Sequence, residues 1–175
     1  MITLTNWPDE TEKTLMELYE NVDQSNCLVT VNISSHQQTE NYIRIIKSGD
    51  NDGKPFLCRA VCLDDQLIGK AELTRYDDNS AELDIVLRRE YCGRGYGTKA
   101  VVDLVYTVIG MNWCSKIRAY VSAANKPAGR MLMKVGFKPL RKFKADIMVP
   151  AENTYSLKEQ DGYEFILEIP EITVS

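Results

Sequence analysis

Three glycines at alternate positions, within residues 92–98 (CGRGYGT), constrain the fold of this chain more than any other stretch. Residues 81–87 (AELDIVL), just before them, predict a strand, and residues 98–111 predict a helix. Glycine permits a sharp turn and a close approach of backbone N–H groups to a ligand. The first turn of a helix adds free N–H donors and a partial positive charge. The combination indicates either an anion site, most often for phosphate, or a plain connecting turn.

The charges are segregated along the sequence, although the net charge is only −4. Residues 1–87 carry 7 Lys/Arg against 16 Asp/Glu, residues 88–144 carry 13 against 2, and residues 145–175 carry 1 against 7. The basic block contains the glycine turn, which suits a polyanionic ligand there and a cationic partner elsewhere. The overall acidity argues against a protein that binds nucleic acid.

The chain has 175 residues, which is enough for one domain with a sizeable core. No apolar run approaches the roughly 18–20 residues of a membrane span. The N-terminus lacks the basic and apolar regions of a secretory signal. Five widely spaced cysteines predict reduced thiols and hence a cytoplasmic location. One histidine and the absence of a CxxC motif predict that there is no metal site.

Hydrophobic periodicity predicts a single α/β (α+β) domain, with a mixed sheet of six or seven strands flanked by about four helices. Residues 2–5 predict an edge strand. Short turns join the strands predicted over 56–63, 67–76 and 80–87, so these strands should form an antiparallel meander. Two earlier helices are predicted by apolar residues at helical spacing, namely Leu15, Leu18, Tyr19 and Val22, then Thr39, Tyr42, Ile43 and Ile46.

After the helix over 98–111, a strand over 117–122 should run parallel to the strand over 80–87. Asn125 and Pro127 predict the start of another helix, and Gly136 predicts its end. Residues 137–144 and 163–169 predict two further strands. The polar residues 145–162 predict a loop or a short helix, and residues 48–55 predict a loop. Residues 27–33 fit either a strand or a loop.

The order of elements and motifs over residues 81–137 resembles the GNAT superfamily of acetyl-CoA-dependent N-acetyltransferases. The pyrophosphate loop of that family has the pattern Arg/Gln-x-x-Gly-x-Gly/Ala. Residues 92–97 match it at Gly95 and Gly97, whereas Cys92 replaces the Arg or Gln. Asn125, Ala128 and the sequence KVGF at 134–137 match a second family segment. The resemblance is closest to the branch that includes ribosomal-protein N-terminal acetyltransferases.

The resemblance implies acetyl-CoA as co-substrate, with a binding core over 80–137. It also implies a variable acceptor-side part over 1–55 and an acceptor-side loop over 145–162. The pantetheine arm would pair like an added strand with the open edge of the strand over 80–87. Asn125 would bond this arm, act as a helix N-cap, or do both. The residues implied in binding acetyl-CoA are Ile85, Val86, Leu87, Cys92, Gly93, Arg94, Gly95, Tyr96, Gly97, Thr98, Asn125, Ala128 and Arg130, with Lys99 and Lys126 able to add charge near phosphate.

In the implied reaction, a neutral amine attacks a thioester, and because amines are mostly protonated at pH 7, a base must remove a proton. Glu82 is the first candidate base, and Asp84 is the second because it lies two residues on and shares its face. Either carboxylate is also suited to bind the positive charge of the acceptor, or simply to face solvent. Leu132 occupies the position where many family members have a tyrosine as general acid. The residues considered as substitutes for that acid are Tyr91, Tyr96, Tyr120 and Ser122.

We therefore expect an N-acetyltransferase that moves the acetyl group of acetyl-CoA to a primary amine of a cationic small molecule or a peptide N-terminus. The amine would attack directly in a ternary complex. The alternative, based on Leu132, is a catalytically weak or inactive module that binds acyl-CoA. We expect no nucleic-acid partner and no membrane partner, and a homodimer is left open. His36, the one histidine, is expected at the surface or in a helix cap rather than at the acceptor.

Overall fold

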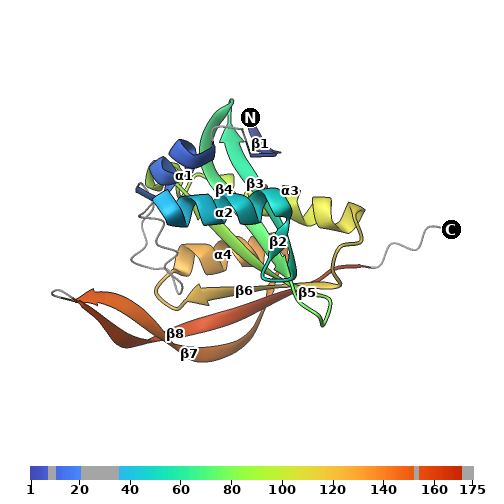
Figure 1. Cartoon of the computed structure of the whole chain (residues 1–175). Helices are drawn as coiled ribbons and strands as arrows, with labels where there is room; N and C mark the ends of the chain where they lie inside the picture. Colours follow the sequence, from blue (N-terminus) through green and yellow to red (C-terminus); the bar gives the residue numbers. More distant parts are fainter. Residues whose placement is uncertain (8–10, 21–35, 152–153, 171–175) are drawn as a thin grey trace.

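The computed structural model describes residues 1–7, 11–20, 36–151 and 154–170 (Figure 1). A mixed sheet forms its centre, with the strand order β1-β3-β4-β5-β6-β8-β7, and the two-residue β2 (Asp50–Asn51) pairs with β3 outside this path. The other strands are β1 (Ile2–Thr5), β3 (Lys54–Leu63), β4 (Gln66–Arg75), β5 (Ser80–Leu87), β6 (Lys116–Ser122), β7 (Lys138–Ala151) and β8 (Thr154–Glu168). The predicted α/β class with a mixed sheet is confirmed.

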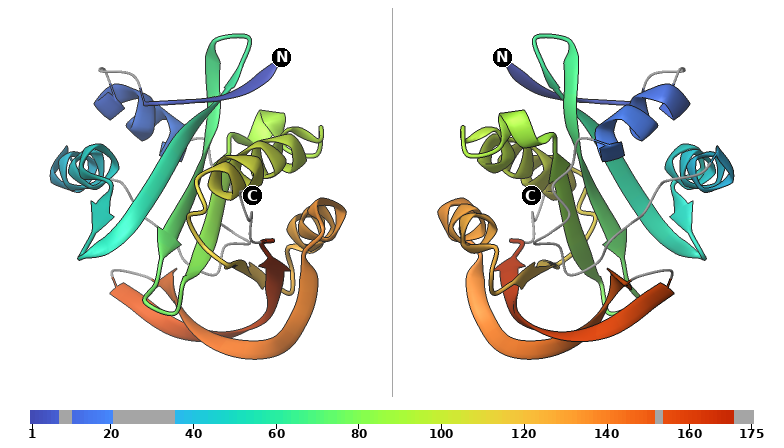
Figure 2. Two further views of the ribbon diagram at one scale, coloured as in Figure 1. Left: turned by 90° about the vertical axis from the view of Figure 1, so that its right-hand side faces the viewer. Right: turned by 90° about the vertical axis from the view of Figure 1, so that its left-hand side faces the viewer.

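Helices cover both faces of the sheet, as Figure 2 shows edge-on. On one face, α1 (Thr11–Glu20) contacts β4 and α2 (His36–Ser48) contacts β3. On the other face, α3 (Tyr96–Gly110) contacts β1, β4 and β5, and α4 (Lys126–Val135) contacts β6 and β7. A short 3-10 helix, η2 (Arg89–Tyr91), connects β5 to the glycine turn.

The main core lies between the sheet and α3. Ala100, Val101, Leu104 and Val108 of α3 are buried, as the predicted apolar stripe requires. Ala81 and Leu83 of β5 are buried, and Ile85 and Leu87 pack against the same core. Because neighbouring residues of a strand point to opposite faces, Glu82 and Asp84 are directed to the other face of the sheet.

The second layer of the fold, made by α1 and α2, also follows the predicted spacing. Leu15, Leu18 and Thr39 have no exposed surface. Tyr42, Ile43 and Ile46 of α2 pack against Leu15 and Tyr19 of α1. Val22 and the stretch 27–33, which the sequence left between strand and loop, lie outside the described residues.

The predicted parallel pairing of β5 with β6 is confirmed, and it is short. Its register joins Ser80 to Lys116, Ala81 to Ile117 and Glu82 to Arg118. Beyond Glu82, β5 remains paired with β4 up to Leu87, whereas β6 remains paired with β8. Figure 1 shows the two strands diverging toward their carboxyl ends. The sheet is therefore split between β5 and β6 at the end where the glycine turn begins.

The loop or short helix predicted over 145–162 is wrong. Residues 145–151 and 154–162 extend β7 and β8 into a long antiparallel hairpin, with pairs such as Met148 to Leu157 and Lys144 to Asp161. The outer part of the hairpin leaves the core, and residues 156–159 are exposed. A strand that is exposed on both faces has no apolar alternation, so the hydrophobic pattern could not reveal it.

Two further elements differ slightly from those predicted from the sequence. The loop predicted over 48–55 contains a tight hairpin, in which Asp50 pairs with Pro55 and Asn51 with Lys54. Its turn residues, Asp52 and Gly53, have positive φ values of 53° and 79°, as expected for an Asp-Gly hairpin turn. The helix predicted from residue 98 begins two residues earlier, because the glycine turn already adopts helical geometry at Tyr96.

Gly69 of β4 holds β4 close to the carboxyl end of β5. An added Cβ there would overlap the Val86 carbonyl oxygen and lie 3.1 Å from the Leu87 Cα. Because both atoms are backbone, Gly69→Ala should separate the strands and lower the free energy of unfolding by about 1–3 kcal/mol in urea denaturation. Gly110→Ala is the matched control, since nothing lies within 4 Å of its added Cβ. Equal stability of the two variants would contradict this packing.

Candidate active site

The glycine turn presents backbone N–H groups at the start of α3. Gly93 and Gly95 have left-handed φ values of 74° and 83°, which favour glycine strongly. Gly95 is the N-cap of α3, and the first intrahelical bond runs from the Lys99 N–H to the Gly95 carbonyl at 3.2 Å. The N–H groups of the first three helical residues therefore have no intrahelical acceptor. This is the geometry of an anion site at a helix N-terminus.

Gly97, which with Gly95 matches the two glycines of the pyrophosphate-loop pattern, lies inside the first turn of α3. A Cβ added to it would lie 3.5 Å from the Leu87 Cδ1 and 3.8 Å from the Ile85 Cδ1. The start of α3 thus rests on the carboxyl end of β5, beside the split. Cys92, at the odd position of the pattern, is exposed, and its Sγ lies 3.6 Å from the Arg88 carbonyl oxygen.

The start of α4 lies at the same end of the split, because α4 follows β6 as α3 follows β5 (Figure 1). Asn125 is the N-cap of α4, and its Oδ1 accepts from the Ala128 N–H at 3.2 Å. The N-cap role of Asn125 is confirmed, and its side-chain NH2 group makes no hydrogen bond to the residues that the structure describes. Four exposed cations flank the two helix starts, namely Arg94, Lys99, Lys126 and Arg130.

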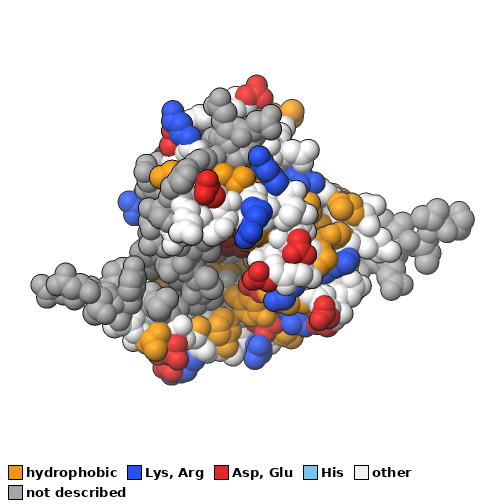
Figure 3. Space-filling model, in the orientation of Figure 1, with side chains coloured by type: hydrophobic (Ala, Val, Ile, Leu, Met, Phe, Trp, Pro, Cys, Tyr) orange, Lys and Arg blue, Asp and Glu red, His pale blue; other side chains and the backbone are white. Residues whose placement is uncertain are grey.

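The opposite face of β4 and β5 carries an acidic pocket of about 240 Å³. We call it the acidic pocket; it is lined by Asn51, Asp52, Lys54, Glu72, Thr74, Tyr76, Glu82 and Asp84. Four of these side chains are carboxylates and one is a lysine. The predicted shared face of Glu82 and Asp84 is confirmed, and the pocket suits a cation. Around it, acidic and basic side chains are interspersed on this face of the molecule (Figure 3).

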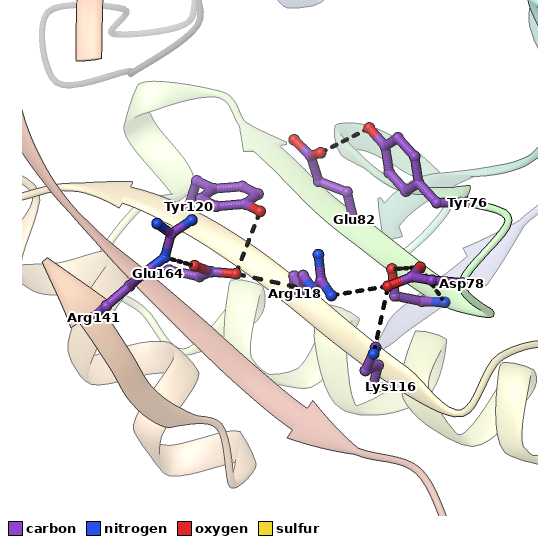
Figure 4. A network of polar contacts seen from close by, with 9 residues as sticks. Tyr76, Asp78, Glu82, Lys116, Arg118, Tyr120, Arg141 and Glu164 are labelled. Carbon is purple, nitrogen blue, oxygen red and sulfur yellow. Dashed lines mark hydrogen bonds and ion pairs between the residues drawn. The ribbon is translucent and has the colours of Figure 1, made fainter. Parts of the chain in front are cut away.

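Glu82 also borders a second pocket, of about 460 Å³. The Tyr76 hydroxyl donates to the Glu82 Oε2 at 2.9 Å. Burial, together with this bond to Glu82, raises the pKa of Tyr76 to about 12, so Tyr76 stays a neutral donor. Figure 4 shows Glu82, Arg118 and Tyr120 on the same side of β5 and β6. The second pocket is lined by Tyr76, Asp77, Asp78, Ser80, Ala81, Glu82, Arg118 and Tyr120.

Two charged residues of β4 were not identified from the sequence, namely Glu72, which lines the acidic pocket, and Lys70, which contacts Glu72 and Asp84. Lys70 is fully buried on β4, and its Nζ lies 2.7 Å from the Glu72 Oε2 and 3.0 Å from the Asp84 Oδ2. The available signal was the pair of charges at alternate positions within an otherwise apolar strand. Such a pair places both side chains on one face, but it does not show which face is buried.

A network of charged side chains joins the β4–β5 turn, β6, β7 and β8 at the second pocket (Figure 4). Arg118 donates from Nη2 to the Asp78 Oδ2 at 2.9 Å. Glu164, almost fully buried, accepts from Arg141 and, at 3.4 Å, from the Tyr120 hydroxyl. Burial is the main cause that raises the pKa of Tyr120, so its hydroxyl stays protonated.

The remaining predicted residues lie as follows. Leu132, at the expected position of a tyrosine, is a core residue with 2% exposure. Tyr91 donates to Gln66 at 3.0 Å, and the Ser122 hydroxyl accepts from the Ala124 N–H at 3.2 Å. Of the four substitutes considered for the general acid, Tyr120 is therefore the one that shares a pocket with Glu82. His36 is the first residue of α2.

Tyr96, the fourth residue considered as a substitute for the general acid, packs against Tyr91 with 6.3 Å between ring centroids.

In the described part of the chain, no group of three or more His, Cys, Asp or Glu side chains is arranged to hold a metal ion. None of the helices there combines the length and hydrophobicity that crossing a lipid bilayer requires.

A family model described as "Acetyltransferase (GNAT) domain" matches residues 2–138. No curated protein sequence matches the chain. The fold is similar to spermidine N-acetyltransferase from Vibrio cholerae in complex with CoA and spermine, with a TM-score of 0.77 and 19% identity over 96% of this chain and 95% of that one.

Two other solved structures have similar folds. A putative acetyltransferase from Salmonella typhimurium with its cofactor acetyl-CoA has a TM-score of 0.72 at 15% identity, over 100% of this chain and 98% of that one. Ribosomal-protein-alanine N-acetyltransferase from Brucella melitensis has a TM-score of 0.72 at 15% identity, over 96% and 99%. At these identities the likeness establishes the fold.

Asp78 ties the β4–β5 turn to β6. Hydrogen bonds from Ser80, with the charge of Lys116, lower the pKa of Asp78 from 3.8 to about 2. Because the folded-state pKa is lowered, the stabilisation is present above pH 3.8 and is lost as the pH falls from about 4 to about 2. Asp78→Asn should therefore flatten the loss of stability to urea in this window. Asp77→Asn, which removes the same charge one residue away, should keep the wild-type slope, and a wild-type slope in Asp78→Asn would contradict the assignment.

Proposed function

The chain belongs to the GNAT acetyltransferase family, and we propose that it transfers the acetyl group of acetyl-CoA to a primary amine of a cationic acceptor. The amine attacks the thioester directly in a ternary complex. The observation that supports this proposal best is the split between β5 and β6, with N–H donors of the glycine turn at its end and the acidic pocket on the opposite face. A donor bound along the split would meet an acceptor bound in the pocket.

The residues around the split fit coenzyme A. The N–H groups of residues 93–98 suit its pyrophosphate, and Arg94, Lys99, Lys126 and Arg130 add exposed positive charge nearby. The β5 edge beyond Glu82 is free of β6, so Ile85, Val86 and Leu87 can pair with the pantetheine arm through their backbone. The Asn125 side-chain NH2 group, next to Ala128, can donate to an amide oxygen of the arm. Bound acetyl-CoA would supply the activated thioester.

The acidic pocket supports a cationic acceptor. Four carboxylates face one lysine among its lining residues, and this balance attracts an ammonium group. Both acceptor classes expected from the sequence, a cationic small molecule and a peptide N-terminus, present a primary amine. The similar folds from Vibrio cholerae and Brucella melitensis are named for a spermidine and a ribosomal-protein substrate, respectively, so the fold accommodates either class.

Glu82 is the base in this proposal, because it borders both pockets and its one described partner is the neutral Tyr76 hydroxyl. Its carboxylate accepts a proton from the ammonium group of the acceptor, through water, and the neutral amine that results attacks the thioester. Asp84 is bound by the ammonium group of Lys70, which makes it better suited to hold the acceptor charge than to take a proton. Tyr120 is the candidate that protonates the leaving thiolate, whose ordinary pKa of about 8.5 makes this help modest.

The alternative is a weak or inactive module that binds acyl-CoA. It is motivated by Leu132, which fills the core at the position where many family members carry a tyrosine. Release of free thiol from acetyl-CoA, measured with a panel of polyamines, peptides and amino acids, separates the two. Tight CoA binding without thiol release on any amine would favour the alternative.

Binding of acetyl-CoA should stabilise the protein. At about 100 times the Kd, the free energy of unfolding rises by about 2.7 kcal/mol, which differential scanning calorimetry detects as a higher Tm. Gly95→Val should lose this increase, because a side chain at φ 83° distorts the turn and blocks the approach of the pyrophosphate. Gly110→Ala should keep it. If saturating acetyl-CoA leaves the wild-type Tm unchanged, the proposed function is wrong.

Glu82 and Asp84 should differ in their kinetic effects. Glu82→Gln should lower kcat by about 10²–10⁴-fold, because a general base is lost. Asp84→Asn should mainly raise the KM for the acceptor, by about tenfold. Asp103→Asn, on α3, is the control and should behave as wild type. A Glu82→Gln variant with wild-type kcat would exclude Glu82 as the base.

A further inference from the structure

A lysine with no exposed side-chain surface lies directly behind the acidic pocket. Lys70 is on β4, and α1 and α2 cover this part of the sheet. A buried ammonium group is costly unless other groups replace its hydration. The contacts of Lys70 therefore show which groups compensate its charge.

Side chains from three other elements replace that hydration, together with Glu72 of β4. The Lys70 Nζ lies 2.7 Å from the Glu72 Oε2, 3.0 Å from the Asp84 Oδ2 and 2.9 Å from the Tyr42 hydroxyl. It also lies 5.2 Å from the ring centroid of Tyr42 and 5.8 Å from that of Tyr19. Burial alone would lower the pKa of Lys70, but the two carboxylates raise it above its ordinary value. Lys70 is therefore an ammonium group at neutral pH.

The two carboxylates need this cation because of their register. Glu72 of β4 is the direct partner of Asp84 on β5, and like charges at directly opposed positions destabilise a sheet. Water screens Glu72 poorly, since 14% of its side chain is exposed, and burial raises its pKa against the opposing effect of Lys70. Lys70, two residues before Glu72 on the same strand, reaches both carboxylates.

Lys54 of β3 is a second cation in the lining of the same pocket, and its Nζ lies over the ring of Tyr76, 4.9 Å from the centroid. Tyr19 of α1, Tyr42 of α2 and Cys58 of β3 face the cluster. Burial is the first cause that raises the pKa of Tyr19 and of Cys58 to about 12, and it raises that of Tyr42 as well. These three groups are neutral at pH 7. Among the described contacts, Lys70 is the cation shared by Glu72 and Asp84.

We propose that Lys70 is a positioning residue of the acceptor site, the counter-ion that allows Glu72 and Asp84 to face each other as carboxylates in the acidic pocket. Without it, one of the two takes up a proton near neutral pH, and the pocket loses a negative charge that an ammonium acceptor needs. The consequence for the acceptor rests on the proposed function. The counter-ion role itself is a property of the free protein and is tested separately.

The counter-ion role is tested by carbon-13 NMR titration of the side-chain carboxyl groups in the protein without acetyl-CoA. In Lys70→Met, one carboxyl group of the pair should take up its proton at a pH at least one unit higher than in the wild type. Lys70→Arg, which keeps the charge, should restore the wild-type titration. The double variant Lys70→Met/Glu72→Gln should abolish the change, because Asp84 then no longer has a carboxylate as its direct cross-strand partner. An unchanged titration in Lys70→Met would overturn the proposal.

Stability provides a second measurement if Lys70→Met folds poorly. Removing the cation and one carboxylate together should leave a folded protein that is clearly more resistant to urea than Lys70→Met alone. A double variant as unstable as the single variant would show that Lys70 acts through packing, and the counter-ion role would be wrong.

Kinetics test the consequence for the acceptor. In Lys70→Met, the KM for a cationic amine should rise about tenfold at pH 7 and fall again as the pH is raised, while the KM for acetyl-CoA stays unchanged. Cys58→Ala, which shortens a neutral neighbour of the cluster, is the control. An equal, pH-independent rise in both variants would overturn the proposal. Absence of transfer by the wild type would overturn the proposed function, and the carboxyl titration would still decide the role of Lys70.

Discussion

The short parallel pairing of β5 with β6 is the constraint on which the site depends. Three residue pairs join the strands, and beyond Glu82 and Arg118 each strand pairs with its outer neighbour alone among the strands that the structure describes. Contacts on both sides keep the two strands apart. On the β5 side, Gly69 allows β4 to lie close to the end of β5, and the first turn of α3 packs on Ile85 and Leu87. On the β6 side, pairing with β8 keeps β6 in place. A backbone edge next to a helix N-terminus is thereby left in the middle of a sheet, where it would otherwise be paired.

The split also separates the two kinds of charge that the proposed reaction needs. Exposed cations flank the starts of α3 and α4, and carboxylates line the pocket on the other face of the sheet. The separation is not complete, because Lys70 stands behind the acidic pocket and Arg118 at the border of the second pocket. Lys70 binds Glu72 and Asp84, and Arg118 binds Asp78 and Glu164, so the charges that are segregated along the chain form local ion networks in the fold (Figures 3 and 4).

The sequence predicted the turns and helix ends, because these are determined by residues that lie close together in the chain. Three glycines, an Asn-x-Pro start and an αL glycine end were enough to identify the turn and both helices that border the split, because such signals act within a few residues. The antiparallel meander and the parallel crossover followed from turn lengths and chain order.

What the sequence missed depends on long-range pairing. The β7–β8 hairpin beyond Lys144 has no core to impose alternation, so its polar composition resembled that of a loop. The cluster of Lys70 with Glu72 and Asp84 arises from the register of β4 with β5 and from burial under α1 and α2, neither of which a single strand encodes.

Amide hydrogen exchange with and without acetyl-CoA tests the central role of the split most directly. We expect exchange at residues 85–87 and 93–98 to slow on binding, and binding that leaves both stretches unchanged would contradict this role of the split.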